Sequence, residues 1–290
     1  MKQPSVTAVV HATIIRDELL RYVKEAIGSI RAHTPTDSQI HRARKQLKRA
    51  RANLRLLRDV IGKATYTREN VGLRDAARPL SGVRDAAVLG ETANSLIQAT
   101  RRGPRRRLLL KVRRALEQAR LEARAELRLM NAIKESTACL EAAAERIRRW
   151  KLKDATRAAL CSGLQRTYRR GRDAFAMACA KPSNEHLHEW RKQVKYLGQS
   201  LDVWNRHGAH HVKRDLQDAD KLAKLLGADH DLAVIAQRLD NLDSPHPVRP
   251  AITRHITDQR SDLLKKVLKK GQRLFKAKPR PFVHNIVRPY

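Results

Sequence analysis

One segment of this chain occurs twice, and the duplication limits the folds that the chain can adopt. The sequence Ile-His-Arg-Ala-Arg-Lys-Gln-Leu-Lys-Arg at positions 40–49 returns as Leu-His-Glu-Trp-Arg-Lys-Gln-Val-Lys-Tyr at 187–196. His41 and His188 are 147 residues apart in a chain of 290. A second pair of similar segments, 80–89 and 226–235, has nearly the same separation, 146 residues from Asp85 to Asp231. A unit of several elements is therefore repeated, once in each half of the chain.

Both copies of the first segment have the periodicity of an amphipathic helix. Apolar residues recur every three or four positions, which is typical of a helix that buries one face. In the first copy these residues are Ile40, Ala43, Leu47, Ala50, Leu54, Leu57 and Ile61, and in the second they are Leu187, Trp190, Val194, Leu197, Leu201 and Trp204. We expect each copy to be a helix whose apolar face packs in the core.

A row of cations adjoins each apolar face. In the first copy the row consists of His41, Arg44, Lys48, Arg51, Arg55 and Arg58. In the second it consists of His188, Arg191 and Lys195 with Lys192 beside them, and Gly198 and Asp202 then interrupt it. A charged helix face is most often simply solvated, but these rows have a single sign and repel themselves at the i,i+4 spacing. We therefore expect the two rows to face a common polyanion.

The repeated histidines and aspartates each have two possible roles. A His beside Arg and Lys has a lowered pKa unless an anion is bound, so His41 and His188 would be poor bases but suitable pH-sensitive donors to an anion. The alternative is a hydrogen-bonded His that faces the core. For Asp85 and Asp231 we favour structural roles over catalysis, as an N-cap near a helix start or as the partner of a neighbouring cation.

The overall charge indicates the class of partner. The chain has 62 Lys and Arg against 29 Asp and Glu, a formal charge of +33. Self-repulsion on this scale favours a polyanionic partner, and the candidates are nucleic acid, an anionic membrane and inorganic polyphosphate. Aromatic residues make up only 4% of the chain, which argues against a surface that stacks the bases of single strands.

The chain reads as all-α, because no segment of any length alternates polar and apolar residues with period two. We expect one domain over residues 1–290, with repeat halves at about 6–150 and 151–285. The expected helices cover about 6–32, a segment from an N-cap at Asp37 or Ser38 to Gly62, a pair broken at 79–82, 154–180, a second repeated helix capped by 181–184, and 251–275. The segment 105–150 is also expected to be helical, either with a break near Asn131 or as one helix that spans both halves. Pro279 and Pro281 indicate a short, irregular end.

Motifs for metal, cofactor or catalysis are not evident. The three cysteines, Cys139, Cys161 and Cys179, are widely spaced without a CxxC pair, so free thiols are expected. The cluster His207, His210 and His211 is more typical of a loop than of a zinc site. Arg101–Arg107 is either a phosphate contact or a solvated junction between helices. We find no nucleotide-binding, zinc-protease or nucleophile-elbow motif, and expect no enzyme activity and no cofactor. We also expect no signal peptide and no membrane span.

These motifs together resemble the CHAD domain family, the conserved histidine α-helical domain. The resemblance rests on His41-x-x-Arg44-Lys45-x-x-Lys48-Arg49, on His188-x-x-Arg191-Lys192-x-x-Lys195, and on the segments 84–89, 167–172, 227–234 and 271–275. It covers nearly the whole chain and implies two pseudo-symmetric helical bundles that enclose a basic central cleft or channel. It also implies binding of inorganic polyphosphate and an association with polyphosphate granules in the cytoplasm.

The resemblance implies which residues line the cleft. His41, Arg44, Lys45, Lys48 and Arg49 would form one wall, and His188, Arg191, Lys192 and Lys195 would form the other. Arg51 and Arg55 continue the first row and are included in the predicted site, although Gly198 and Asp202 leave the second copy without matching cations. Two other functions remain open, a protein that binds nucleic acid without sequence specificity and a polyphosphate-processing enzyme.

Overall fold

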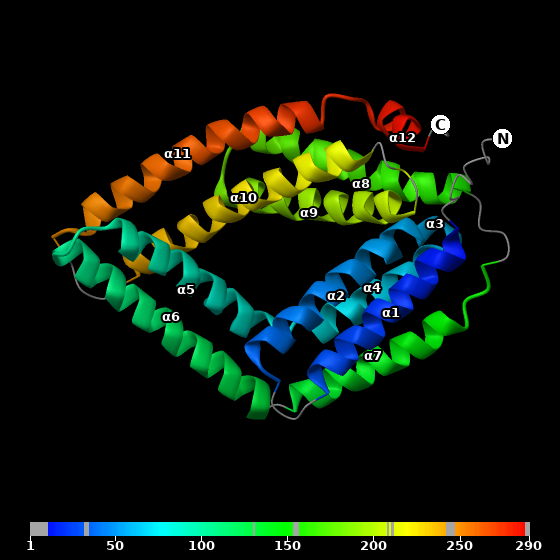
Figure 1. The fold of residues 1–290 in the computed structure, drawn as a ribbon, viewed down its shortest axis with the longest axis horizontal. Helices are drawn as coiled ribbons and strands as arrows, with labels where there is room; N and C mark the ends of the chain where they lie inside the picture. Colours follow the sequence, from blue (N-terminus) through cyan, green and yellow to red (C-terminus); the bar gives the residue numbers. More distant parts are fainter. Residues whose placement is uncertain are drawn as a thin grey trace, which may run out of the picture.

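The computed structural model describes residues 11–31, 35–129, 131–152, 157–207, 209, 212–241 and 247–287 (Figure 1). Its helices are α1 (Ala12–Ile30), α2 (Asp37–Leu56), α3 (Arg58–Ile61), α4 (Lys63–Ala77), α5 (Ser81–Ala99), α6 (Pro104–Leu129), α7 (Ala132–Arg148), α8 (Arg157–Ala180), α9 (Asn184–Arg206), α10 (Lys213–Asp240), α11 (Arg249–Leu274) and α12 (Pro279–Val287). These ranges contain no strand, so the all-α prediction is confirmed. None of the described helices is long and apolar enough to cross a membrane.

The repeat separation relates the helices of the two halves. A shift of 147 residues carries α2 onto α9, and the same shift carries α1 onto α8 and α6 onto α11. One clear difference between the halves is that α4 and α5 of the first half correspond to the single helix α10 of the second. Pro79 stands between α4 and α5, whereas the corresponding position of α10 is Leu225. A proline inside a helix removes a backbone hydrogen bond and clashes with the preceding turn, so only the first half has a break here.

The apolar faces of the repeated helices are buried as predicted. Trp190 and Leu54 have no exposed surface. The other apolar residues of the two stripes, as far as Leu57 in the first copy and Trp204 in the second, are at most 6% exposed. Ile61 is half-buried at the edge of the same core. Since this face is fixed in the core, the adjoining row of cations is fixed in direction on both helices.

Two hydrophobic cores hold the helices together, and each contains helices from both halves. The larger core joins α1, α2, α4, α7 and the start of α5 with α8, α9, α12, the first part of α10 and the last part of α11. The smaller core joins α5 and α6 with the second part of α10 and the first part of α11. Figure 1 shows α10 and α11 extending from beside α8 and α9 toward α5 and α6. With 28 and 26 residues they reach about 40 Å, which lets each take part in both cores.

Several predicted helix boundaries were wrong. The N-cap of α2 is Thr36, not Asp37 or Ser38, because Thr36 and Gln39 form a capping box. Asp37 instead accepts a hydrogen bond from Arg120 of α6, at 2.6 Å. The described segment after α11 is not irregular, because α12 begins at Pro279, at the first helical position, where the missing N–H of proline costs nothing, and continues to Val287. Phe282 on α12 stacks on Tyr168 of α8, with ring centroids 3.7 Å apart.

Two other boundaries agree with the predictions, and one does not. Asn131 separates α6 from α7 in a left-handed conformation with φ of 47°. Ser183 caps α9 by accepting a hydrogen bond from the backbone N–H of His186. The expected start of the first helix at about residue 6 is not borne out, because the helix begins at Ala12 after an extended His11; residues 1–10 lie outside the described ranges.

Candidate functional site

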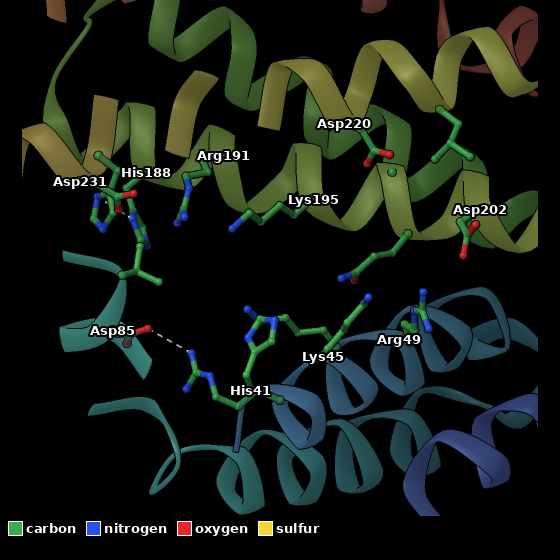
Figure 2. Close-up of a pocket in the computed structure, with 17 residues that line it drawn as sticks. His41, Lys45, Arg49, Asp85, His188, Arg191, Lys195, Asp202, Asp220 and Asp231 are labelled. Atoms are coloured by element: carbon green, nitrogen blue, oxygen red, sulfur yellow. Dashed lines mark hydrogen bonds and ion pairs between the residues drawn. The ribbon is translucent and has the colours of Figure 1, made fainter. Parts of the chain in front are cut away.

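A cavity of about 670 Å³ lies between α2 and α5 on one side and α9 and α10 on the other. In Figure 2, His41 and Lys45 point from α2 toward Arg191 and Lys195 of α9. The lining residues are His41, Arg44, Lys45, Lys48, Arg49, Asp85, Val88, His188, Arg191, Lys195, Gly198, Gln199, Asp202, Leu216, Asp220, His230 and Asp231. The two repeated helices therefore present their cations to one shared space.

Eight of the eleven residues that the sequence analysis placed in the site line this cavity. They are His41, Arg44, Lys45, Lys48, Arg49, His188, Arg191 and Lys195. His41 and His188 are both exposed to the cavity rather than packed in the core, so the alternative of core-facing histidines is wrong. The buried apolar stripe of each helix forces this orientation, because the neighbouring face has to point away from the core.

The other three predicted residues lie elsewhere. Lys192 forms an ion pair with Glu189 on its own helix. The Nε of Arg51 donates a hydrogen bond to Asn70 of α4 at 3.0 Å, because the helix has turned this residue toward α4. Arg55 is only 9% exposed, and its guanidinium lies 3.6 Å from the centre of the Tyr196 ring. At this level α2 packs directly on α8 and α9, so the basic row leaves the cavity before it reaches Arg55.

Four carboxylates share the cavity with six Arg and Lys side chains. Asp85 forms an ion pair with Arg44 at 3.2 Å, which agrees with its predicted role as the partner of a neighbouring cation. Asp231 lies inside α10 and not near a helix start, so this part of the prediction was wrong. The reason is that α10 has no proline at the position equivalent to Pro79 and continues through it as one helix. Burial raises the pKa of Asp231, and the charge of Asp85 across the cavity raises it further. The repeat thus contributes one aspartate from each half.

His230 is a cavity residue that the sequence analysis did not assign to the site. Its Nδ1 lies 3.4 Å from the Nδ1 of His188, and the ring centroids are 4.7 Å apart. Burial lowers the pKa of His230 to about 4, with a further contribution from Arg191. Burial and Arg191 also lower the pKa of His188, in the direction expected for a His beside cations. His230 occurs in only one copy of the repeat, where the first half has Arg84, so the duplication gave no signal for it.

Crowding of like charges is greatest around Lys195. Burial, together with the neighbouring cations Arg191 and Lys48, lowers the pKa of Lys195 to about 8. Lys48 belongs to α2 and Lys195 to α9, so the repulsion acts across the cavity between the two repeated helices. A bound anion would offset this repulsion and restore the ammonium form.

The remaining predicted features lie outside the cavity. His207 is 3.4 Å from Glu18, whereas His210 and His211 lie outside the described residues. No group of three metal-ligating side chains occurs in the part of the chain that the structure describes. Cys139 and Cys161 are half-buried free thiols, and Cys179 is exposed. Arg101, Arg102 and Arg105 line a separate, mainly apolar pocket at the junction of α5 and α6.

Fold and site together define an all-α protein in which a duplicated helix brings cations to a shared cavity. The CHAD domain family matches residues 21–240, and the chain belongs to this family. The crystal structure of the CHAD domain from the plant Ricinus communis is similar, with 17% sequence identity, a TM-score of 0.50, and coverage of 100% of this chain and 96% of that chain.

A second solved structure is also similar. PptA from Streptomyces chartreusis has 13% sequence identity and a TM-score of 0.54, and the match covers 92% of this chain and 98% of that chain. At these identities both structures establish the fold alone. No match was found among curated proteins.

Proposed function

We propose that this protein binds inorganic polyphosphate in the central cavity and does so without catalysis. The observation that carries the proposal is the convergence of the two repeated helices, α2 and α9, whose Arg and Lys side chains enter one cavity from opposite sides. In this proposal the duplicated halves act as two pseudo-symmetric bundles around a basic cleft. Rigid helices suit a repetitive ligand, because each phosphate unit can meet a donor that is already in place.

The chemistry of the lining suits a phosphate chain. Arg binds phosphate oxygens with two parallel hydrogen bonds, and Lys adds a mobile point charge. Polyphosphate offers about one charge per unit and no bases, so it requires no aromatic platform. The adjacent rings of His188 and His230 provide further N–H donors once the negative ligand favours their protonation.

The space available suits a linear ligand. A second cavity of about 1040 Å³ shares seven lining residues with the first, among them Lys45, Lys48, Arg191 and Lys195. The two spaces therefore adjoin at these cations. A chain longer than the central cavity could extend between α5 and α10 toward this second space.

A binding role is favoured over hydrolysis by the donor set. Metal-assisted phosphoryl transfer requires carboxylates or histidines that hold a metal together. In the described residues no three such groups come together, and Asp85 is engaged by Arg44. Association with polyphosphate granules would follow from this binding.

The proposal is tested by competition at two salt concentrations. Fluorescent long-chain polyphosphate would be displaced either by unlabelled polyphosphate or by duplex DNA at equal phosphate. We expect polyphosphate to win by about tenfold or more at the higher salt, because recessed cations fit a single chain but not a duplex. Equal competition by DNA would show that the charge acts as an unspecific surface.

A pair of double variants locates the binding. Lys45→Gln with Arg191→Gln removes two cavity cations, one from each repeated helix. Arg113→Gln with Arg114→Gln removes two exposed cations from α6 and serves as the control with the same change of charge. We expect only the first pair to lose about tenfold or more in affinity. Equal losses in both variants would contradict a site in the cavity.

A further inference from the structure

Four arginines converge at a second place, away from the central cavity. Arg55 of α2, Arg58 of α3, and Arg166 and Arg170 of α8 line a shallow pocket together with Tyr66, Gly163, Thr167, Gln193 and Tyr196. We name this group the arginine pocket. It shares no lining residue with the central cavity and contains no carboxylate. We propose that the arginine pocket binds a single phosphate group, either free or at the end of a longer chain, as a site distinct from the central cavity.

Arg55 is the strongest indication that an anion binds in the arginine pocket. Its side chain is 9% exposed, its Nη1 donates to the backbone oxygen of Arg51 at 2.9 Å, and its guanidinium stacks on Tyr196. Neither partner carries a negative charge, and no described carboxylate pairs with Arg55. Burial is the main reason that the pKa of Arg55 falls to about 10, and the nearby cations Arg51 and Arg170 contribute to this lowering. A buried guanidinium without an anion destabilises a fold, and a bound oxyanion would remove this penalty.

The surrounding arginines increase the positive potential. Arg58 stacks on Tyr66, with 5.2 Å between the guanidinium carbon and the ring centre. Arg166 pairs with Asp59, which lies outside the pocket lining, and its buried Nη1 has no hydrogen-bond partner among the described residues. Arg170 is exposed at the rim. Of the four guanidinium groups, that of Arg166 is paired with a carboxylate, and aromatic rings hold those of Arg55 and Arg58 in position.

A glycine brings these arginines together. A Cβ atom on Gly163 would lie 2.7 Å from the backbone oxygen of Leu56, so the backbone of α8 touches the end of α2. Arg166 and Arg170 follow one and two turns after Gly163 on the same face of α8. This close approach therefore places them beside Arg55 and Arg58. The cluster is a consequence of helix packing and not of the repeat.

The size of the pocket determines how an anion would bind. The interior space is about 10 Å³, less than a phosphate group needs, so the ligand has to enter at the rim. Arg170 is exposed and Arg58 is half-buried, so both side chains have room to move around an anion. Their forked guanidinium groups can each donate two hydrogen bonds to phosphate oxygens, with Arg55 and Arg166 behind them.

The test follows arginine side chains directly in the full-length protein. The Nε–H signals of 15N-labelled arginine would be recorded while inorganic phosphate is added at constant ionic strength, with chloride as the reference anion. We expect the signals of Arg55 and Arg166 to shift and saturate with phosphate but not with chloride. In Arg58→Gln with Arg170→Gln the affinity read from these signals should fall by about tenfold, the value of one or two charge-assisted contacts.

The control variant separates the arginine pocket from the central cavity. Lys45→Gln with Arg191→Gln removes the same charge from the cavity and should leave the phosphate response of Arg55 and Arg166 unchanged. An unchanged affinity in Arg58→Gln with Arg170→Gln, or an equal response to chloride, would overturn the proposal. Failure of polyphosphate to bind in the central cavity would not overturn this proposal, because the signals of Arg55 and Arg166 report on the arginine pocket.

A second titration distinguishes the two sources of the phosphate group. Long-chain polyphosphate should shift the signals of Arg55 and Arg166 in both the native protein and Lys45→Gln with Arg191→Gln if the pocket binds phosphate independently. A shift in the native protein alone would support the pocket as the site for the end of a chain anchored in the cavity. Absence of a shift with both phosphate and polyphosphate would overturn the proposal.

Discussion

Lys195 carries its ammonium group into the cavity beside Arg191 and opposite Lys48. Burial and these cations lower its pKa to about 8, below its ordinary value of 10.5. The unfolded chain therefore binds more protons between pH 8 and 10.5, and the free protein becomes more stable as the pH rises through this window. Ligand binding has the opposite dependence, because a polyanion favours the protonated form of Lys195.

We predict that the affinity for polyphosphate falls by about tenfold between pH 7 and pH 9, as Lys195 loses its proton in the free protein. The measurement is a fluorescence titration with polyphosphate at both pH values and constant ionic strength. Lys195→Arg is the control, because Arg stays charged over this range and should show a much weaker dependence. The same slope in both proteins would assign the pH effect to another group.

Asp85 lines the same cavity and forms an ion pair with Arg44, so under the proposed function its negative charge should oppose the binding of a polyanion. We predict that Asp85→Asn strengthens polyphosphate binding by about threefold, since it removes this charge and releases a guanidinium edge. Titration of the two proteins would measure the difference. Asp262→Asn, on the exposed face of α11, removes an equal charge at a distance and should have little effect. Weaker binding in Asp85→Asn would instead mean that the carboxylate positions Arg44 for the ligand.

At the scale of helices, the placement of α9 depends on close contact with α8 and α11. A Cβ atom on Gly271 of α11 would lie 2.5 Å from Trp190 and 2.6 Å from Phe175. Trp190 precedes Arg191 and packs fully in the core, so movement of its ring would also move the cavity wall. The contact between two apolar faces thus controls the position of the neighbouring basic face.

We predict that Gly271→Ala lowers the free energy of unfolding by about 1–3 kcal/mol, the usual cost of overpacking a core. Thermal or urea unfolding followed by circular dichroism would measure it. Gly28→Ala in α1 is the matched control, because its Cβ meets nothing within 4 Å and should stabilise the helix by about 0.5–1 kcal/mol. Similar effects of the two substitutions would show that the contact with Trp190 relaxes freely.

The helices could be predicted from the periodicity of their apolar residues, and the two facing basic rows could be predicted from the duplicated segment. The cap at Thr36 and the helix at Pro279 were missed, because a capping box and a short buried helix depend on a few local contacts. Arg55 was placed in the site because its spacing continues the row. Only the tertiary structure shows that α2 packs against α8 and α9 at Arg55, beyond the edge of the cavity.

Two other cavity residues carried no readable signal. His230 has no counterpart in the first half, and Asp220 belongs to no repeated motif. Burial raises the pKa of Asp220, and so does the charge of Asp202. Such effects arise only when two helices bring side chains together, so the mixed charge of the cavity was not evident from a sequence with a formal charge of +33.

At the scale of the whole molecule, this excess charge opposes the folded state, and a bound polyanion should relieve it. We predict that polyphosphate raises the Tm of the protein and that added salt reduces the increase, because salt screens the attraction and weakens counterion release. Calorimetry at two salt concentrations, with and without polyphosphate, would measure this. Salt alone should raise the Tm of the free protein, and a salt-independent shift with polyphosphate would contradict an electrostatic mechanism.

The shared cores have a consequence for how the chain folds during its synthesis. The pair α5 and α6 emerges early from the ribosome, but its core is completed only by α10 and α11. The apolar faces of α5 and α6 therefore remain without their packing partners until more than a hundred further residues have been translated. Contacts between such distant segments form slowly and leave apolar surface exposed in the meantime. Nascent chains of this protein are therefore expected to depend on protection by chaperones until most of the second half has been made.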